Sequence, residues 1–234
     1  MQRVHTPEIM DRPDVDEDQL RLALGYIRGV NRRLGGVSAL LTHLESWSAG
    51  WESGSRITLL DIATGSADIP VRASRWARSR GFDLAITAVD VHEKTLAEAR
   101  RHSADDPGII IERADAFELP DRFGDSSFDY VHAGLFLHHL EDEARVTEML
   151  GIMDRIARRG VIWNDLMRTR VGYAAIHLLT LGQPEMIRHD ARVSVRAGFT
   201  RREALRLADL AGLGYTSYAS NYFTHRFTVA GEKR

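Results

Sequence analysis

The chain has 234 residues, a formal net charge of −2 and no cysteine. This length is enough for one α/β domain with a sizeable core, and the lack of cysteine excludes disulfides, thiolate metal sites and cysteine nucleophiles. The balanced charge argues against a nucleic-acid partner, because such proteins usually present a basic face. No stretch approaches the roughly 18 apolar residues of a membrane span, and the N-terminus lacks the apolar core of a secretory signal. We therefore expect no membrane partner and a cytoplasmic location.

The first 54 residues carry helical patterns and no strand pattern. Residues 1–18 show no regular spacing and are expected to form an irregular arm. Apolar residues recur at helical spacing in 19–34 and again in 37–47, which predicts two helices. We interpret residues 1–54 as an arm and a helical lid over the domain formed by 55–234.

From residue 55 onward, strand patterns alternate with helical patterns. The predicted strands are 57–61, 84–90, 109–113, 128–133 and 160–164, and the helices between them are 69–80, 93–102 and 143–157. Alternation at this spacing is typical of a parallel sheet covered by helices on both faces.

The last third of the chain departs from this alternation. Residues 166–199 form a helical, loop-rich insert, and 200–211 follow as a helix with Thr200 as N-cap and Glu203 as its capping-box partner. Two strands, 215–220 and 223–229, lie so close in sequence that they are expected to run antiparallel. The predicted fold is α/β: a doubly wound, seven-stranded, mostly parallel sheet with an antiparallel terminal hairpin.

Three acids follow successive predicted strands: Asp61, Asp90 and Asp115. In a doubly wound sheet the carboxyl ends of the strands line one crevice. Asp61 leads into a turn of small residues around Gly65, where a ligand can approach the backbone closely, and it can bind either the ligand or the loop itself. Asp90 has the position of a carboxylate that accepts from both ribose hydroxyls, and Asp115 can accept from an adenine amino group. The alternative is that these acids cap helices or face solvent.

The turn does not fit the common nucleotide motifs. A dinucleotide fingerprint requires glycine for close helix packing where this chain has Asp68, and a P-loop requires a Gly-Lys-Ser/Thr sequence that does not follow. The ligand class that remains is a single adenosine with a small charged tail, such as S-adenosylmethionine.

Five segments in order, 61–68, 88–90, 114–120, 128–131 and 137–140, resemble the motifs of class I S-adenosylmethionine-dependent methyltransferases, most closely the ubiquinone/menaquinone group. The resemblance covers roughly residues 55 to 165, and it implies a Rossmann-like methyltransferase fold in which 55–234 bind the cofactor. Many members carry glycine where this chain has Ala63 and Ala67, which leaves the loop geometry in doubt. The cofactor-binding residues that the resemblance implies are Asp61, Ala63, Thr64, Gly65, Asp68, Asp90, Val91, Asp115, Ala116, Ala133 and Gly134.

Segments outside this range narrow the resemblance. Residues 31–36, 164–168, 189–190 and 194–196 resemble a bacterial subgroup that accompanies type III polyketide synthases and is thought to methylate phenolic lipids or related polyketides. An apolar stretch at 174–181 is expected either to line an acceptor pocket or to be a buried helix.

Four residues are candidates for catalysis. His138 and His139 follow the fourth strand, and because neighbouring side chains point in different directions we expect at most one, His139, to face the site. Asp165 ends the fifth strand at the same crevice. His189 with Asp190 forms either a base with its orienting partner or a loop clamp. Such groups would assist removal of a proton from a phenol, whose pKa is about 10.

The predicted function is transfer of a methyl group from S-adenosylmethionine to a small phenolic, quinol-like or polyketide acceptor, with O-methylation favoured over C-methylation. No helical His-x-x-x-His pair is present, so no metal is predicted. The arginines of 151–206 leave open an RNA or protein methyltransferase, and a non-catalytic cofactor-binding module is the other alternative. The oligomeric state is left open.

Overall fold

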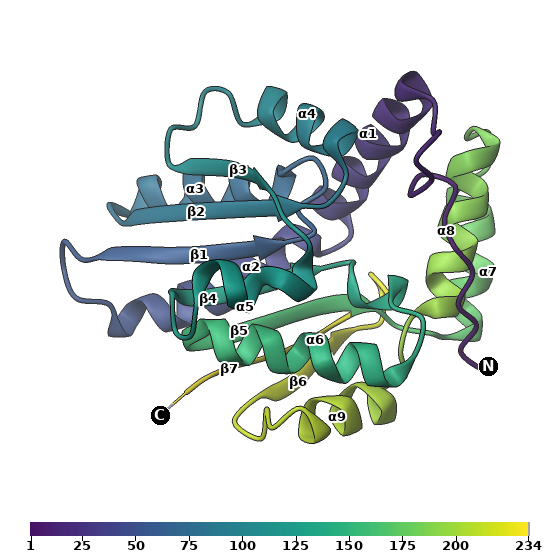
Figure 1. Ribbon diagram of the computed structural model, residues 1–234. Coiled ribbons are helices and arrows are strands. Elements are labelled where there is room, and N and C mark those ends of the chain that lie inside the picture. Colours follow the sequence, from purple (N-terminus) through teal and green to yellow (C-terminus); the bar gives the residue numbers. More distant parts are fainter. Residues whose placement is uncertain (234) are drawn as a thin grey trace.

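The computed structural model describes residues 1–233. One sheet runs through the molecule with the strand order β3-β2-β1-β4-β5-β7-β6 (Figure 1). The pairs among β1 to β5 are parallel, whereas β7 is antiparallel to both β5 and β6. The predicted fold is therefore confirmed. The strands are β1 (Arg56–Ile62), β2 (Asp83–Asp90), β3 (Ile109–Arg113), β4 (Phe128–Gly134), β5 (Ala157–Leu166), β6 (Ser217–Asn221) and β7 (Arg226–Glu232).

Helices cover both faces of the sheet because successive strand residues point to opposite sides. Leu59 of β1 packs with α2 and α3, whereas the next residue, Leu60, packs with α6 and α9. The helices are α1 (Glu17–Arg33), α2 (Gly36–Trp47), α3 (Asp68–Arg80), α4 (Glu93–His102), α5 (Leu119–Phe123), α6 (Glu143–Ile156), α7 (Arg170–Leu179), α8 (Glu185–Ala197) and α9 (Arg201–Leu210), with short 3₁₀ turns η1 (Ser48–Gly50), η2 (Ala116–Glu118) and η3 (Leu137–His139).

Most predicted elements are present, and the differences have local causes. β5 begins at Ala157 rather than at 160, since Ala157 pairs with Phe128 of β4 ahead of an irregularity at Arg158 and Arg159, after which the regular register starts at Gly160. The last strand was predicted at 223–229 but begins at Arg226, because residues 222–225 form the turn of the hairpin. The short η2 and α5 were not predicted. The capping box of Thr200 and Glu203 is confirmed.

The N-terminal segment reaches the carboxyl ends of the parallel strands. Residues 1–16 are irregular and lie along α8 (Figure 1), with the Val4 N–H donating to the Arg196 carbonyl. Leu24 of α1 and Ile187 of α8 belong to one apolar cluster, which packs the two helices together beyond the strand ends. Among residues 1–233, no helix combines the length and apolarity needed to cross a bilayer.

Candidate active site

A cavity of about 500 Å³ lies at the carboxyl ends of the parallel strands. The sheet side supplies the loops after β1, β2, β3 and β4. The opposite side consists of the N-terminal arm, α1 and α8, including Leu24, Ile187 and Val195. All of the predicted cofactor-binding residues except Ala133 line this cavity: Asp61, Ala63, Thr64, Gly65, Asp68, Asp90, Val91, Asp115, Ala116 and Gly134. Ala133 is fully buried inside β4.

The turn after β1 lines the cavity and contains one buried hydroxyl without a partner among residues 1–233. Ala63, Gly65 and Ala67 have φ angles of +53°, +57° and +55°, so this chain holds the left-handed turn even where it lacks glycine, at about 1–2 kcal/mol per alanine. Nothing lies within 4 Å of the position that a Cβ would take on Gly65. The buried Thr64 hydroxyl has no hydrogen-bond partner within residues 1–233. A ligand with a polar group therefore fits this turn.

Asp90 joins the ends of β1 and β2. Its carboxylate accepts from the Gly65 N–H at 3.1 Å and from the His92 N–H at 3.0 Å. Burial raises the pKa of Asp90, against the lowering effect of these two donors. Each carboxylate oxygen keeps a free lone pair, so Asp90 can also accept from hydroxyls of a ligand.

Asp115 differs from Asp90 because it is exposed and acts as an N-cap. Its carboxylate accepts from the Phe117 N–H at 2.9 Å, at the start of η2. The capping alternative therefore holds for Asp115, although the residue also lines the cavity. Above η2, the Arg145 guanidinium lies 3.5 Å from the centre of the Phe117 ring, and both side chains line the same end of the cavity.

Asp61 pairs with a histidine that the sequence did not assign to the site. Its carboxylate accepts from His132 Nδ1 at 2.5 Å, and both side chains are buried. His132 is among the residues that line the cavity, and its buried Nε2 atom has no partner within residues 1–233. His132 lies inside β4, and its contact with Asp61 joins this strand to the end of β1.

Asp68 is held by a buried polar network. Asn31 Nδ2 donates to Asp68 Oδ2 at 3.1 Å, and Arg226 donates both to Asn31 Oδ1 at 2.8 Å and to Asn164 Oδ1 at 2.9 Å. Burial lowers the pKa of Arg226 to about 10. The network connects α1, α3, β5 and β7, so residues that are far apart in the sequence orient the first turn of α3.

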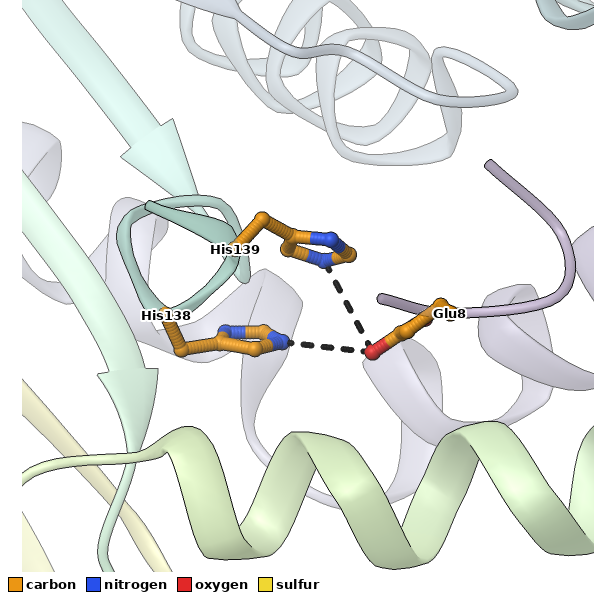
Figure 2. Close-up of side chains that lie close together, drawn as sticks. All are labelled: Glu8, His138 and His139. Atoms are coloured by element: carbon orange, nitrogen blue, oxygen red, sulfur yellow. Dashed lines mark ion pairs between the residues drawn. The ribbon is translucent and has the colours of Figure 1, made fainter. Parts of the chain in front are cut away.

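Both histidines after β4 face the cavity, so the expectation that only one would do so is wrong. η3 wraps the chain tightly enough that the two rings lie side by side, with centroids 4.4 Å apart. Figure 2 shows His138 and His139 pointing toward Glu8 of the N-terminal arm. Glu8 Oε1 lies 3.7 Å from His138 Nε2 and 3.8 Å from His139 Nε2.

Each imidazole is held from behind by a carboxylate. His138 Nδ1 donates to Asp165 Oδ1 at 2.6 Å, and His139 Nδ1 donates to Asp11 Oδ2 at 2.9 Å. Burial alone would lower the pKa of His139, but Glu8 and Asp11 outweigh it and raise this pKa to about 10. Burial would also lower the pKa of His138, but Asp165 outweighs burial, so this pKa is raised as well.

The other two catalytic candidates lie outside the cavity wall. Asp165 is fully buried behind His138 and acts only through that ring. The His189 side chain is 39% exposed and does not line the cavity. Its neighbour Asp190 accepts from the Ile9 and Met10 N–H groups at 2.7 and 3.0 Å. Asp190 therefore holds the N-terminal arm in place, as the loop-clamp alternative predicted.

The 174–181 stretch divides between the two alternatives left open for it. Ile176 lines the cavity, but Leu178 and Leu181 are 71% and 70% exposed. The segment is therefore neither a complete pocket wall nor a buried helix.

Among the cavity residues that the sequence did not assign to the site are Glu8, Asp11 and Asn31. Asn31 lies in a segment that carried a family resemblance, so its sequence offered a signal. Glu8 and Asp11 lie in the irregular arm, which carries no spacing signal, and only the packing of that arm on α8 brings them to the histidines.

The family model described as a methyltransferase domain matches residues 52–162. The magnesium protoporphyrin IX methyltransferase of Synechocystis PCC 6803, solved with bound S-adenosylhomocysteine, has a TM-score of 0.63 at 14% identity and covers 93% of this chain and 94% of that chain. Residues 52–162 thus carry a methyltransferase domain, and the fold of the chain is that of the class I S-adenosylmethionine-dependent methyltransferases. The predicted cofactor, S-adenosylmethionine, is confirmed by this domain match together with the likeness to a fold solved with S-adenosylhomocysteine.

Two further proteins are similar to this chain. The ubiquinone/menaquinone biosynthesis C-methyltransferase UbiE of Rickettsia felis is 34% identical over 87 residues, covering 36% of this chain and 34% of the relative. The chain thus spans about a third of the length of the curated relative it matches. The CurJ carbon methyltransferase has a TM-score of 0.69 at 12% identity and covers 95% of this chain and 62% of that chain.

Proposed function

We propose that this methyltransferase transfers a methyl group to the hydroxyl of a small phenolic, quinol-like or polyketide acceptor. One observation carries the proposal. A single cavity joins the crevice around Gly65 and Asp90 to the polar cluster of Glu8, His138 and His139. A cofactor in the crevice and an acceptor at the cluster would lie end to end, which is the arrangement that methyl transfer requires.

The proposed cofactor site uses the residues that the sequence singled out. Asp90 would accept from the ribose hydroxyls, Asp115 and the Arg145–Phe117 pair would enclose the adenine end, and the Thr64 hydroxyl would meet the polar tail. When bound, S-adenosylmethionine supplies an electrophilic methyl group on a sulfonium. The protein itself contributes alignment and the exclusion of water.

The proposed acceptor site differs in one respect from the general base expected from the sequence. With a pKa of about 10, His139 is protonated at neutral pH and donates rather than accepts a proton. Its role would be to stabilise the negative charge that develops on the acceptor oxygen, since a nearby cation favours the ionised form of a phenol. Asp165 and Asp11 would be positioning residues for the two rings.

C-methylation is the second candidate, and the comparisons favour it. UbiE and CurJ are described as C-methyltransferase and carbon methyltransferase, respectively. An ionised phenol is nucleophilic at oxygen and at the adjacent ring carbons, so the same cluster could serve either outcome. We keep O-methylation first because the polar cluster would hold the hydroxyl itself.

We also propose that residues 1–54 act as the lid of this site. Met10 of the arm and Leu24, Ile27 and Val30 of α1 line the cavity, which gives the acceptor an apolar enclosure. Arg145 is the only arginine among the lining residues, and no lysine lines the cavity within residues 1–233. This charge pattern supports a small acceptor over RNA, and the cavity that remains beside the two histidines supports an enzyme over a non-catalytic binding module.

Binding of S-adenosylhomocysteine, measured by calorimetry, tests the cofactor site. We expect micromolar affinity, a loss of at least about tenfold in Asp90→Asn, and no change in Asp129→Asn, whose carboxylate binds Thr58 and Arg158 away from the cavity. Absence of binding to the unsubstituted protein would refute the proposal.

The acceptor is tested with S-adenosylmethionine and a panel of phenols, hydroquinones and alkylresorcinols. An O-methylated monophenol loses the alkaline shift of the phenolate absorbance, whereas a C-methylated one keeps it; for the diphenols, NMR distinguishes a methoxy group from an aryl methyl group. Turnover of RNA or of a protein but of no small phenol would contradict the proposed acceptor class, and binding without any turnover would favour the non-catalytic module.

A further inference from the structure

The Glu8, His138 and His139 cluster has the composition of a metal site. One donor atom from each side chain lies within 4.8 Å of the other two. Two imidazoles with one carboxylate is the donor set of known zinc and non-haem iron sites. The 3.7 and 3.8 Å separations from Glu8 Oε1 to the two Nε2 atoms are too long for hydrogen bonds. They slightly exceed the roughly 3.4 Å expected between ligands of a tetrahedral ion with bonds of about 2.1 Å.

The support behind the two rings favours coordination. Asp165 and Asp11 occupy the Nδ1 atoms at 2.6 and 2.9 Å, so both Nε2 atoms are turned toward Glu8 (Figure 2). Histidine ligands of metals usually donate their other ring proton to such a carboxylate, which sets the tautomer and the ring orientation. Both histidines of the cluster have such a carboxylate on Nδ1.

Glu8 is anchored on its own side. The Ser194 hydroxyl of α8 donates to Glu8 Oε1, and the arm is tied to η3 by Arg3, which donates to the Leu140 carbonyl at 2.7 Å, and by a 2.8 Å contact between His5 Nε2 and the His139 carbonyl. The Glu8 side chain is buried, with 7% of its surface exposed. An ion would therefore meet a donor set that is already in place.

Charge and access also fit a cation. The carboxylates of Glu8, Asp11, Asp165 and Asp190 gather around the rings, and two arginines, Arg3 and Arg226, interact with Asp165. Buried carboxylates are compensated by nearby cations, and a divalent ion bound to two neutral imidazoles would replace the two ring protons as that positive charge. A second cavity of about 160 Å³, lined by Glu8, His138 and His139 among others, adjoins the cluster from the side of the arm, which provides a path for an ion.

We propose that Glu8, His138 and His139 bind one divalent transition-metal ion, with zinc as the best match to the donor set, at the acceptor end of the cavity. Three protein ligands leave at least one coordination position for an oxygen atom, and the cluster lines the cavity on that side. The role of the ion at the acceptor oxygen rests on the proposed methyl transfer, whereas its binding does not. This inference revises the expectation of no metal, which considered only ligands within one helix.

The test uses the full chain with any affinity tag removed, after dialysis against a chelator. Titration with Zn²⁺ by calorimetry should show one ion per chain, and Co²⁺ should give visible absorption bands of low-symmetry coordination. Glu8→Gln and His139→Gln should each weaken Zn²⁺ binding about 10- to 100-fold or more. The matched control His177→Gln, in α7 and outside the cavity, should leave it unchanged.

Retained S-adenosylhomocysteine binding in each variant shows that it is folded. The metal proposal would be overturned if the unsubstituted protein bound neither Zn²⁺ nor Co²⁺. It would also be overturned if Glu8→Gln and His139→Gln bound Zn²⁺ as tightly as the unsubstituted protein does. Methyl transfer that persists in chelator with no ion bound would overturn the role of the ion while leaving the proposed function intact. Metal binding without turnover of any acceptor would leave the site in place and overturn the function instead.

Discussion

The His138 Nδ1 atom lies 2.6 Å from Asp165 Oδ1, and both side chains are buried. The same carboxylate also accepts from the Leu166 N–H at 2.8 Å, from the Trp163 indole at 3.2 Å and from the His138 backbone at 3.2 Å. Burial would raise the pKa of Asp165, but His138 and these donors lower it. Asp165 thus stays ionised and aligns the His138 ring with the cavity.

Asp165→Asn should therefore impair catalysis without impairing cofactor binding. The amide keeps the shape of the side chain but removes the charge that raises the pKa of His138. We expect kcat to fall about 10- to 100-fold, with the Kd of S-adenosylhomocysteine changed less than twofold. The NMR titration of His138 should shift to lower pH. Asp129→Asn is the matched control. A parallel loss of cofactor affinity in Asp165→Asn would show that Asp165 supports folding and does not specifically align His138.

Gly36 is required by its contact with Asn31. A Cβ on Gly36 would lie 2.4 Å from Asn31 Oδ1 and 2.9 Å from Asn31 Cα, and Asn31 in turn holds Asp68. Gly36→Ala should destabilise the protein by about 1–3 kcal/mol and weaken S-adenosylhomocysteine binding.

Gly29→Ala is the control for this substitution. Gly29 lies inside α1 with only the Arg33 guanidinium, 3.7 Å away, near its Cβ position. We expect Gly29→Ala to be neutral or to stabilise by up to about 1 kcal/mol. Denaturant unfolding measures both variants, and equal effects would show that the contact with Asn31 is unimportant.

His139 should make stability depend on pH in the metal-free protein. Its pKa rises from 6.5 to about 10 on folding, so its contribution is fully present below pH 6.5 and is lost as the pH rises toward 10. In chelator, the unfolding free energy of the unsubstituted protein should exceed that of His139→Gln by about 2 kcal/mol at pH 6, and the difference should shrink toward pH 10. A difference that is constant over this range would contradict the pairing of His139 with Glu8 and Asp11.

α8 should form the acceptor side of the cavity and not the cofactor side. Ala191 lines the cavity next to Ile187 and Val195, so Ala191→Trp should fill the acceptor space. We expect turnover of the acceptor to fall at least about 100-fold, with S-adenosylhomocysteine affinity unchanged. Arg188→Trp, on the exposed side of the same helix, adds the same bulk and should change neither. Loss of cofactor affinity in Ala191→Trp would place α8 over the cofactor instead.

The local pattern of the chain was enough to predict the sheet. The alternation of apolar strands with amphipathic helices from residue 55 to 164 sets the parallel order, because burial on two faces demands it. The acid at the end of β2 and the small-residue turn after β1 indicated the cofactor class. Their chemistry depends on residues that are close in sequence or at the same edge of the sheet.

Only the tertiary structure brought the acceptor end of the site together. Glu8 and Asp11 meet His139 across 131 and 128 positions of the chain, and no periodicity links an irregular arm to a loop that far away. The backbone of η3 turned both histidines inward, which the alternation of neighbouring side chains did not predict. Residues within one element follow a spacing that the sequence displays, whereas contacts between distant loops follow from packing of the whole chain.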